Sequence, residues 1–151
     1  MPSVSLTGKD VVVIDGRVFH GAADADYVNL EFENDLAAMK VSKDGNTIYA
    51  LNQTGNVCKV TMRLLLGCSD DVVLNSRVQQ MKNDFSGFTL LVGSFTKRVG
   101  DGAGGVKNVV YNLANGIFKK MPNAKTNAEG DVEQSVAIYE MMFYNQGRAI
   151  Q

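Results

Sequence analysis

A glycine-rich run in the second half of the chain is the first candidate for chemistry. Gly100-Asp101-Gly102-Ala103-Gly104-Gly105 matches the pattern G-x-G-x-x-G. That pattern holds a dinucleotide pyrophosphate when a strand precedes it and a helix follows it. A strand pattern does precede the run, but residues 106–111 also have a strand pattern. Because the helix that would meet the phosphates is missing, the sequence favours a hairpin loop over a nucleotide site.

A single histidine is the next candidate, for acid–base chemistry. His20 lies near Asp15, Asp24 and Asp26 in the sequence, but no G-x-S-x-G elbow supplies a nucleophile. A hydrogen-bonded structural histidine is therefore favoured. Asp24 and Asp26 could touch a cation, but they lack the oxygen-ligand spacing of a calcium loop, so a solvated loop is the better interpretation. One imidazole nearly excludes a metal site built on several histidines.

The two cysteines give no further site. Cys58 and Cys68 form no C-x-x-C motif, and a disulfide framework needs more cysteines and an oxidising compartment. We expect two reduced and mostly buried thiols. The sequence thus predicts no enzyme: no catalytic residue, no cofactor site and no metal site.

Composition limits the class of protein. The 151 residues predict one domain over residues 1–151, with enough chain for a real core. Fifteen Lys and Arg stand against sixteen Asp and Glu, which argues against a basic nucleic-acid binder and against an acidic tail. No signal peptide and no apolar run of membrane-spanning length is present, so we expect a protein made in the cytoplasm, with no membrane anchor.

Turn signals divide most of the chain into antiparallel strands. Asp15-Gly16 predicts a hairpin between residues 11–14 and 17–19, and Lys43-Asp44-Gly45-Asn46 predicts another between residues 39–42 and 48–51. Alternation over residues 27–33 places Val28, Leu30 and Phe32 on a buried face and Asn29, Glu31 and Glu33 on a polar face. We expect four further strands, over residues 57–66, 88–95, 106–113 and 132–144.

One helix is predicted from about Asp70 to Lys82. Ser69 is a suitable N-cap, and Asp70 and Asp71 suit the positive end of the helix dipole. Leu74, Val78 and Met81 form one apolar stripe that should pack on the sheet. The expected fold class is α+β, mainly β: an antiparallel β-barrel or sandwich with one flanking helix.

Taken together, the order and spacing of these segments resemble a bacteriophage tail tube protein, most closely that of contractile-tailed phages. The similarity covers roughly Val11 to Tyr144, and each matching segment is only a turn with a strand or helix. The segments that carry it are residues 29–36, 41–46, 57–75, 95–102 and 127–135.

The resemblance implies a structural role. Members of this family share a β-barrel or packed-sheet fold with the tube protein of type VI secretion. Six subunits form a ring whose inner sheets join around a lumen, and the rings stack into a tube that passes DNA without specific binding. The implied partners are the tail sheath, tape measure protein, baseplate hub and tail terminator. The implied locations are the host cytoplasm during assembly and then the virion tail. Two alternatives remain: a tube of a type VI or tailocin-like injection system, and a nucleotide-dependent enzyme.

Two sets of residues follow as candidate sites. Glu31 and Glu33 are candidate lumen-facing residues, the alternative being the outer wall or a ring-to-ring contact, and Lys59 and Arg63 could pair with them across the sheet. Two loops are candidate inter-subunit contacts that are mobile in the free subunit and order on assembly, when contacts offset the entropy of their backbone. Their residues are Lys43, Asp44, Gly45 and Asn46 in one loop and Gly100, Asp101, Gly102, Gly104 and Gly105 in the other.

Overall fold

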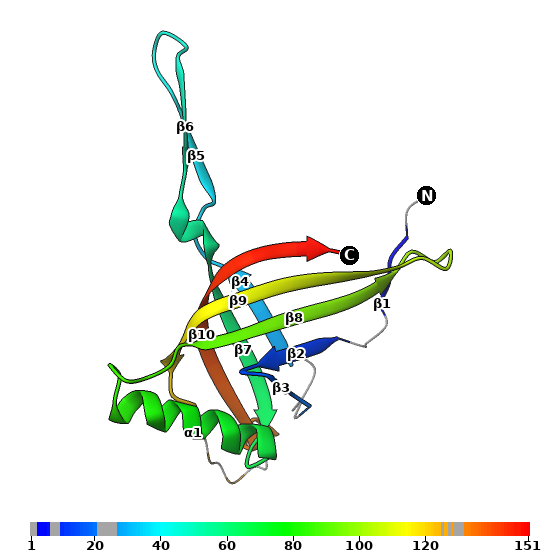
Figure 1. Ribbon diagram of the computed structural model, residues 1–151, viewed down its shortest axis with the longest axis vertical. Helices are drawn as coiled ribbons and strands as arrows, with labels where there is room; N and C mark the ends of the chain where they lie inside the picture. The colour runs from blue at the N-terminus through cyan, green and yellow to red at the C-terminus, as the bar shows by residue number, and fades with distance from the viewer. Residues whose placement is uncertain (1–2, 7–9, 21–26, 125, 127, 129–131) are drawn as a thin grey trace.

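The computed structural model describes residues 3–6, 10–20, 27–124, 126, 128 and 132–151 (Figure 1). Asp24 and Asp26 lie outside this part of the chain. The elements in order are β1 (Ser5–Leu6), β2 (Val11–Ile14), β3 (Arg17–Val18), β4 (Val28–Phe32), β5 (Ala37–Val41), β6 (Thr47–Leu51), η1 (Gln53–Asn56), β7 (Val57–Leu65), α1 (Ser69–Asn83), β8 (Leu91–Gly100), β9 (Val106–Lys120), η2 (Val132–Ser135) and β10 (Val136–Ile150).

Eight of the strands form one antiparallel sheet. Its order is β3-β2-β8-β9-β10-β7-β4, with β1 added to β8, while β5 and β6 form a separate two-stranded sheet. β2 and β7 lie far apart in this order, yet both contribute to the same core, so the sheet curves around its apolar face. β3 and β4 end the sheet without pairing to each other. The expected mainly β, α+β sandwich-like fold is therefore confirmed, as an open curved sheet.

Alternation along β7 and β10 builds most of the core. The two strands pair from Val136↔Leu65 to Tyr144↔Val57. Every second side chain points into the core, because successive residues of a strand face opposite sides of the sheet. The buried set is Cys58, Val60, Met62 and Leu64 from β7 and Ala137, Tyr139, Met141 and Phe143 from β10.

Helix α1 packs on this core at the end of β7 (Figure 1). Leu74 and Val78 are buried, and Met81 packs against the core from its edge, which confirms the predicted stripe. The N-cap prediction was wrong by one residue: the Sγ of Cys68, not Ser69, accepts the backbone N–H of Asp71.

Two ion pairs tie the helix to the first hairpin. Buried Asp70 accepts from the Arg17 side chain at 3.1 Å and from the backbone N–H of His20 at 2.8 Å. Further along the helix, Arg77 donates to Asp15, the first turn residue of the β2–β3 hairpin, at 3.0 Å. A buried carboxylate is stable only when it is paired in this way. The pairs therefore set where the hairpin meets the helix.

Strand ends differ most from the prediction. β9 continues past Asn115-Gly116, a pair that resembles a turn signal, because Asn115 adopts a positive φ of 53° inside the strand. A Cβ on Gly116 would lie 2.2 Å from the Phe143 ring, so only glycine admits that ring. β10 begins at Val136, four residues later than predicted, because a turn of 3₁₀-helix comes first.

The cysteines have the expected state. Both Cys58 and Cys68 are free thiols, the first fully buried and the second partly exposed. Burial raises the pKa of the Cys58 thiol to about 11, because an ionised sulfur would lose its hydration there.

The helix stripe yields a stability prediction. Leu74→Ala should lower the free energy of unfolding by about 2–5 kcal/mol, since the truncation leaves a cavity in the core. Val72→Ala is the matched control on the same helix, because Val72 is 61% exposed. Chemical denaturation of both variants measures the difference. A loss below about 0.5 kcal/mol for Leu74→Ala would contradict the packing of the stripe.

Candidate assembly surfaces

The expected chemical motifs do not converge on a reaction centre. The glycine-rich run is followed by β9, so no helix N-terminus faces it. Within the described ranges, no three His, Cys, Asp or Glu residues are grouped as metal ligands would be. No helix there is long and apolar enough to cross a membrane. The features that remain are surfaces on which another chain could pack.

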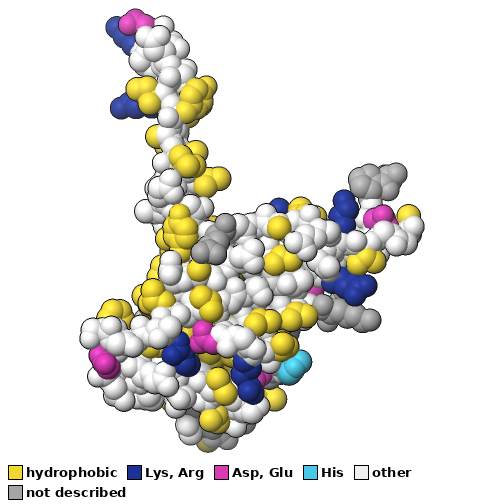
Figure 2. Space-filling model, in the orientation of Figure 1, with side chains coloured by type: hydrophobic (Ala, Val, Ile, Leu, Met, Phe, Trp, Pro, Cys, Tyr) yellow, Lys and Arg dark blue, Asp and Glu magenta, His cyan; other side chains and the backbone are white. Residues whose placement is uncertain are grey.

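The most prominent surface is the β5–β6 hairpin, residues 36–51, which we call the arm. It projects away from the sheet as a two-stranded ribbon (Figure 1). All ten of its strand residues are exposed, and hydrophobic side chains run along its length (Figure 2). The exposed fraction is 75% for Tyr49, 66% for Ile48 and Leu51, and 64% for Met39.

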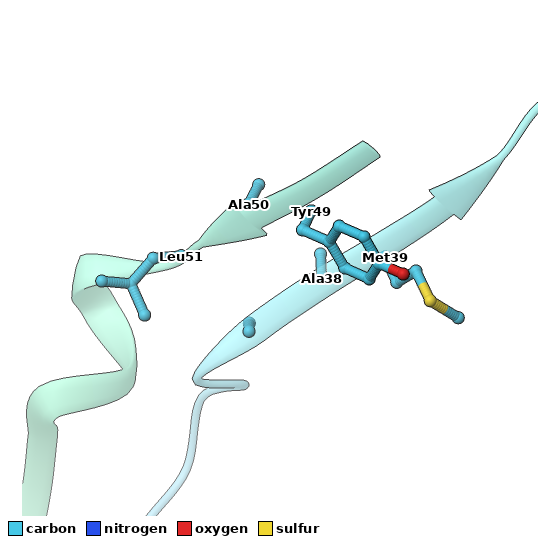
Figure 3. A pocket seen from close by; sticks show the side chains of 6 residues that line it. Ala38, Met39, Tyr49, Ala50 and Leu51 are labelled. Carbon is cyan, nitrogen blue, oxygen red and sulfur yellow. The ribbon is translucent and has the colours of Figure 1, made fainter. Parts of the chain in front are cut away.

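Both faces of the arm are apolar. The pairing Met39↔Tyr49 and Ala37↔Leu51 places these four side chains on one face with Val41. Met39 and Tyr49 lie beside one another across the two strands (Figure 3). The opposite face carries Ala38, Ala50 and Ile48, with Lys40 as its single charge. An isolated two-stranded hairpin is marginal in water, so an arm of this composition is a surface on which another chain could pack.

The root of the arm is closely packed. The N–H of Asn52 donates to the carbonyl oxygen of Leu36 at 2.8 Å and closes the base of the hairpin. The Asn52 side chain accepts from Thr54 at the start of η1. A Cβ on Gly55 would lie 2.6 Å from the Cα of Leu36, so η1 and the arm root touch backbone to backbone. These contacts orient the arm relative to the sheet.

The arm tip contains the first predicted loop. Lys43, Asp44, Gly45 and Asn46 turn the chain as expected, with Gly45 at a φ of 86°. The N–H of Ser42 donates to the carbonyl oxygen of Asn46 at 2.7 Å, and the Asn46 N–H donates to the Ser42 hydroxyl. The tip's place at the end of a projecting arm makes it accessible to another subunit, and a role there stays a prediction.

The sheet also offers a free strand edge at β4 and another along the end of β10. The Arg63 N–H donates to the Tyr27 carbonyl oxygen, so by alternation the backbone groups of Val28, Leu30 and Phe32 point away from β7. β4 is the last strand of the sheet, and no other described strand covers this edge. β10 continues to Ile150 along β9, whereas β7 pairs with it only as far as Tyr144. Such edges are templates for pairing with another chain.

The polar face of the sheet brings Glu33 next to its predicted partner. Lys59 lies 3.6 Å from Glu33 and 3.9 Å from Glu140, which also lies 4.0 Å from Lys120. Glu31 is exposed on the same face, opposite Lys59 in the register, and accepts from Asn29. The predicted pairing with Lys59 is confirmed for Glu33. These three carboxylates and two ammonium groups thus form a surface of mixed charge.

The second predicted loop is organised by one carboxylate. The Oδ1 atom of Asp101 accepts the N–H groups of Ala103 at 2.7 Å and Gly105 at 2.9 Å. Ser3 donates to the Asp101 carbonyl oxygen at 2.6 Å. Gly102 and Gly104 both adopt positive φ values, of 80° and 92°. The two amides hold the pKa of the Asp101 carboxyl below its usual range, because they stabilise its charged form.

Sequence reasoning found the arm as a hairpin but missed that it stands apart from the sheet. The available signal was the lack of alternation: Ala37–Val41 and Thr47–Leu51 have apolar residues at both odd and even positions. A hairpin lying on a core would show a polar face toward water.

Comparisons with known proteins identify the fold. No protein-family model matches the chain, and no curated protein matches its sequence. Two solved structures of an extracellular contractile injection system do match in shape. One is a chain of the PVC sheath–tube complex in the extended state, with a TM-score of 0.59, 11% identity, and coverage of 94% of this chain and 87% of that chain. The other is a chain of the PVC sheath/tube terminator in the extended state, with a TM-score of 0.58, 11% identity, and coverage of 94% and 92%. The fold that the resemblance implied is thus confirmed.

The Asp101 loop yields a pH prediction. The lowered pKa means that the carboxylate stabilises the loop above the usual aspartate value of about 3.9. That contribution is lost as the pH falls through the lowered pKa. Hydrogen exchange should show protection of the Ala103 and Gly105 amides that decreases in acid.

Two variants test whether the Asp101 carboxylate is what protects these two amides. Asp101→Ala should lose this protection at neutral pH. Asp101→Asn is the matched control, because its side-chain oxygen can accept both amides and does not titrate. Equal protection in wild type and Asp101→Ala would mean that the carboxylate does not hold the loop.

Proposed function

We propose that this chain is the structural subunit of a phage tail tube. Six copies form a ring, the rings stack into a hollow tube, and the tube conducts DNA during ejection. The observation that carries the proposal is the arm, a projecting hairpin whose two apolar faces are both uncovered within the subunit. The role is structural and needs no catalytic residue, cofactor or metal.

Assembly through the arm is supported by the size of the exposed apolar surface. Burying a Leu, Ile, Val or Met side chain contributes about 1.5–3 kcal/mol. The arm offers six large apolar side chains that are more than half exposed, and these are Leu36, Met39, Val41, Ile48, Tyr49 and Leu51. A partner that covers several of them gains enough free energy to offset part of the cost of association.

Ring closure is supported by the two free edges. The outer edge of β4 in one copy can add to the uncovered part of β10 in the next, which joins the sheets of neighbouring subunits. Because the two edges differ, this contact is heterologous. Repeated contacts of this kind form a closed ring when the rotation from one subunit to the next returns to the first subunit after a full turn.

The mixed-charge face supports DNA passage. Glu31 and Glu33 would face the lumen, with Lys59 neutralised between Glu33 and Glu140. A lumen wall without free basic clusters gives phosphates no place to bind and stall. In this proposal the two exposed loops, at the arm tip and at Asp101, contact neighbouring subunits.

The proposed partners are the sheath outside the tube, the tape measure protein inside it, and the baseplate hub and tail terminator at its ends. Assembly takes place in the host cytoplasm, and the product is part of the virion tail. The matching structures belong to an extracellular contractile injection system, which favours one second candidate: the tube protein of a type VI or tailocin-like contractile injection system. The content of particles purified with the tube, DNA or protein, separates the two.

The arm can be tested by removing its apolar groups. Met39→Ser with Tyr49→Ser should raise the concentration needed for assembly by on the order of 10- to 100-fold, at about 1.4 kcal/mol per tenfold. The subunit's melting temperature should stay unchanged, because neither side chain belongs to the core. Sedimentation velocity and negative-stain microscopy measure the effect. Val72→Ser is the control, an exposed apolar residue on α1. Wild-type protein that stays monomeric at every concentration up to millimolar would refute the proposal.

The lumen assignment has its own test. Glu31→Lys with Glu33→Lys should leave folding nearly intact, since both side chains are exposed. The resulting tubes should bind DNA at low salt, where phosphate contacts are strongest. Glu31→Gln with Glu33→Gln should give a smaller gain, because it removes charge without reversing it. Lysine-variant tubes that assemble normally and gain no DNA affinity would place these residues outside the lumen.

A further inference from the structure

A pocket of about 350 Å³ lies where the end of β4, the arm root and the later part of β10 come together. Its apolar wall consists of Phe32 and Leu36, which are 45% and 59% exposed. Asp35 lies between two lining residues in the sequence but is not part of the lining, so Arg148 is the one charge of the described lining. The other lining residues are Asn34, Gly55, Asn56, Asn145 and Gly147.

One amide of this lining has an unused donor. Asn145 is only 8% exposed, and its Oδ1 atom accepts the backbone N–H of Gly147 at 2.6 Å. That bond fixes which end of the amide is the oxygen, and the Nδ2 group then has no hydrogen-bond partner among the described residues. The amides of Asn34 and Asn56, by contrast, already donate within the subunit. Because a buried donor without an acceptor is costly and rare in folded proteins, the pocket is suited to receive an acceptor at Asn145.

An irregularity in the pairing of β9 and β10 turns Arg148 toward the same pocket. The pairs are Asn145↔Leu113 and Arg148↔Tyr111, so three steps along β10 match two steps along β9. Leu113 and Tyr111 share a face of β9 because they are two residues apart, and their partners on β10 therefore share a face as well. In a regular strand, Asn145 and Arg148 would point to opposite faces. A bulge of this kind redirects a side chain, often beside a functional site.

The Arg148 guanidinium is held in place but is not neutralised. Its Nε atom donates to the Tyr111 hydroxyl at 3.0 Å, and its Cζ atom lies 5.6 Å from the centre of the Tyr111 ring. Within the described residues, no carboxylate pairs with this guanidinium and no group accepts from its two terminal nitrogens. Those nitrogens have the geometry that binds both oxygens of one carboxylate.

Gly147 keeps space open between these donors. A Cβ at this position would meet no atom within 4 Å, and Gly147 does not adopt a positive φ. Neither crowding nor backbone conformation within the subunit therefore requires glycine here. Glycine inside a strand often marks a place where a ligand or another chain comes close.

We propose that this pocket binds a carboxylate group carried on a short apolar stem. The carboxylate accepts from the Asn145 amide and from the terminal nitrogens of Arg148, and the stem packs against Phe32. A free organic acid and an acidic side chain of a second copy both present this group. The site goes beyond the proposed function and does not require a ring.

Sodium butyrate is the probe, because it joins a carboxylate to a short alkyl stem. It is titrated into nitrogen-15-labelled subunit kept below the concentration at which the protein assembles. In NMR spectra the signals of the Asn145 side-chain amide and of the Arg148 Nε–H group should shift saturably. Sodium chloride at equal ionic strength and n-butylamine hydrochloride should leave both signals in place. The absence of a saturable shift with butyrate, or an equal shift with chloride, would overturn the proposal.

Variants test which groups bind the probe. Arg148→Gln and Asn145→Asp should each weaken butyrate binding by on the order of 10-fold or more, since each removes a donor to the carboxylate. Asn145→Asp keeps the acceptor for the Gly147 N–H and replaces only the free donor. Tyr111→Phe is the matched control, because it removes the hydroxyl that Arg148 contacts but keeps the cation, and it should bind butyrate as wild type does. Gly147→Val should block the pocket without disturbing the fold, because a Cβ there meets no neighbour. Unchanged binding by Arg148→Gln, Asn145→Asp or Gly147→Val would contradict the assignment.

Assembled protein distinguishes the two sources of the carboxylate. If an acidic side chain of a second copy fills the pocket, assembly blocks the response to butyrate, and Arg148→Gln raises the concentration needed for assembly. If the ligand is a free acid, assembled protein responds to butyrate as the free subunit does. Solid-state NMR of the Asn145 side-chain amide measures the response in assembled protein. Butyrate binding by a protein that never forms rings would support the pocket and refute the proposed function, whereas rings built from subunits that do not bind butyrate would refute the pocket alone.

Discussion

The pairing of β7 with β10 is the constraint on which the other features depend. Its register places four side chains of each strand in the core and their neighbours on the polar face. A slip of one residue would bring Lys59 and Glu140 into the core, so the register is strongly specified. The arm leads into this strand pair through η1, just before Val57. The later part of β10 is left unpaired on this side because β7 begins at Val57, which pairs with Tyr144.

What the single subunit leaves uncovered is as informative as what it buries. The core satisfies the apolar faces of the large sheet and of α1, whereas the strand residues of the arm stay exposed in the part of the chain that the structure describes. A monomer seldom keeps an apolar projection of this kind without a partner for it. The polar face has the opposite character, since its charges already neutralise one another across the strands. The arm is thus open to contact with another chain, whereas the charges of the polar face are already paired.

Local chemistry determined how much the sequence could predict. The two Asp-Gly turns, the stripe of Leu74 and Val78, and the alternation around Leu30 are short-range signals, and these elements were predicted correctly. Phe32 was the exception: it was expected on the buried face but is 45% exposed at the end of β4. The continuation of β9 through Asn115-Gly116 was not, because it depends on Phe143, which is distant in sequence. The N-cap was misplaced because serine is a more usual acceptor than the cysteine that precedes it.

The β5–β6 hairpin itself was predicted, but its separation from the sheet depends on which surfaces the other elements leave free. The meeting of Glu33 and Lys59 was predicted as a possibility, since alternation gives the face of each strand but not the register between strands.

The close packing of Gly55 against the arm root has a kinetic consequence. A hairpin on a loose hinge would sample many directions, and most encounters between two copies would then fail. Here the backbone contact and the Asn52–Leu36 hydrogen bond hold the hairpin in one direction before any partner arrives. In the proposed assembly, the orientational search between two copies is thus completed during folding, so a larger share of collisions is productive. Substituting Gly55 would slow the growth of that assembly even where the finished contacts were unchanged.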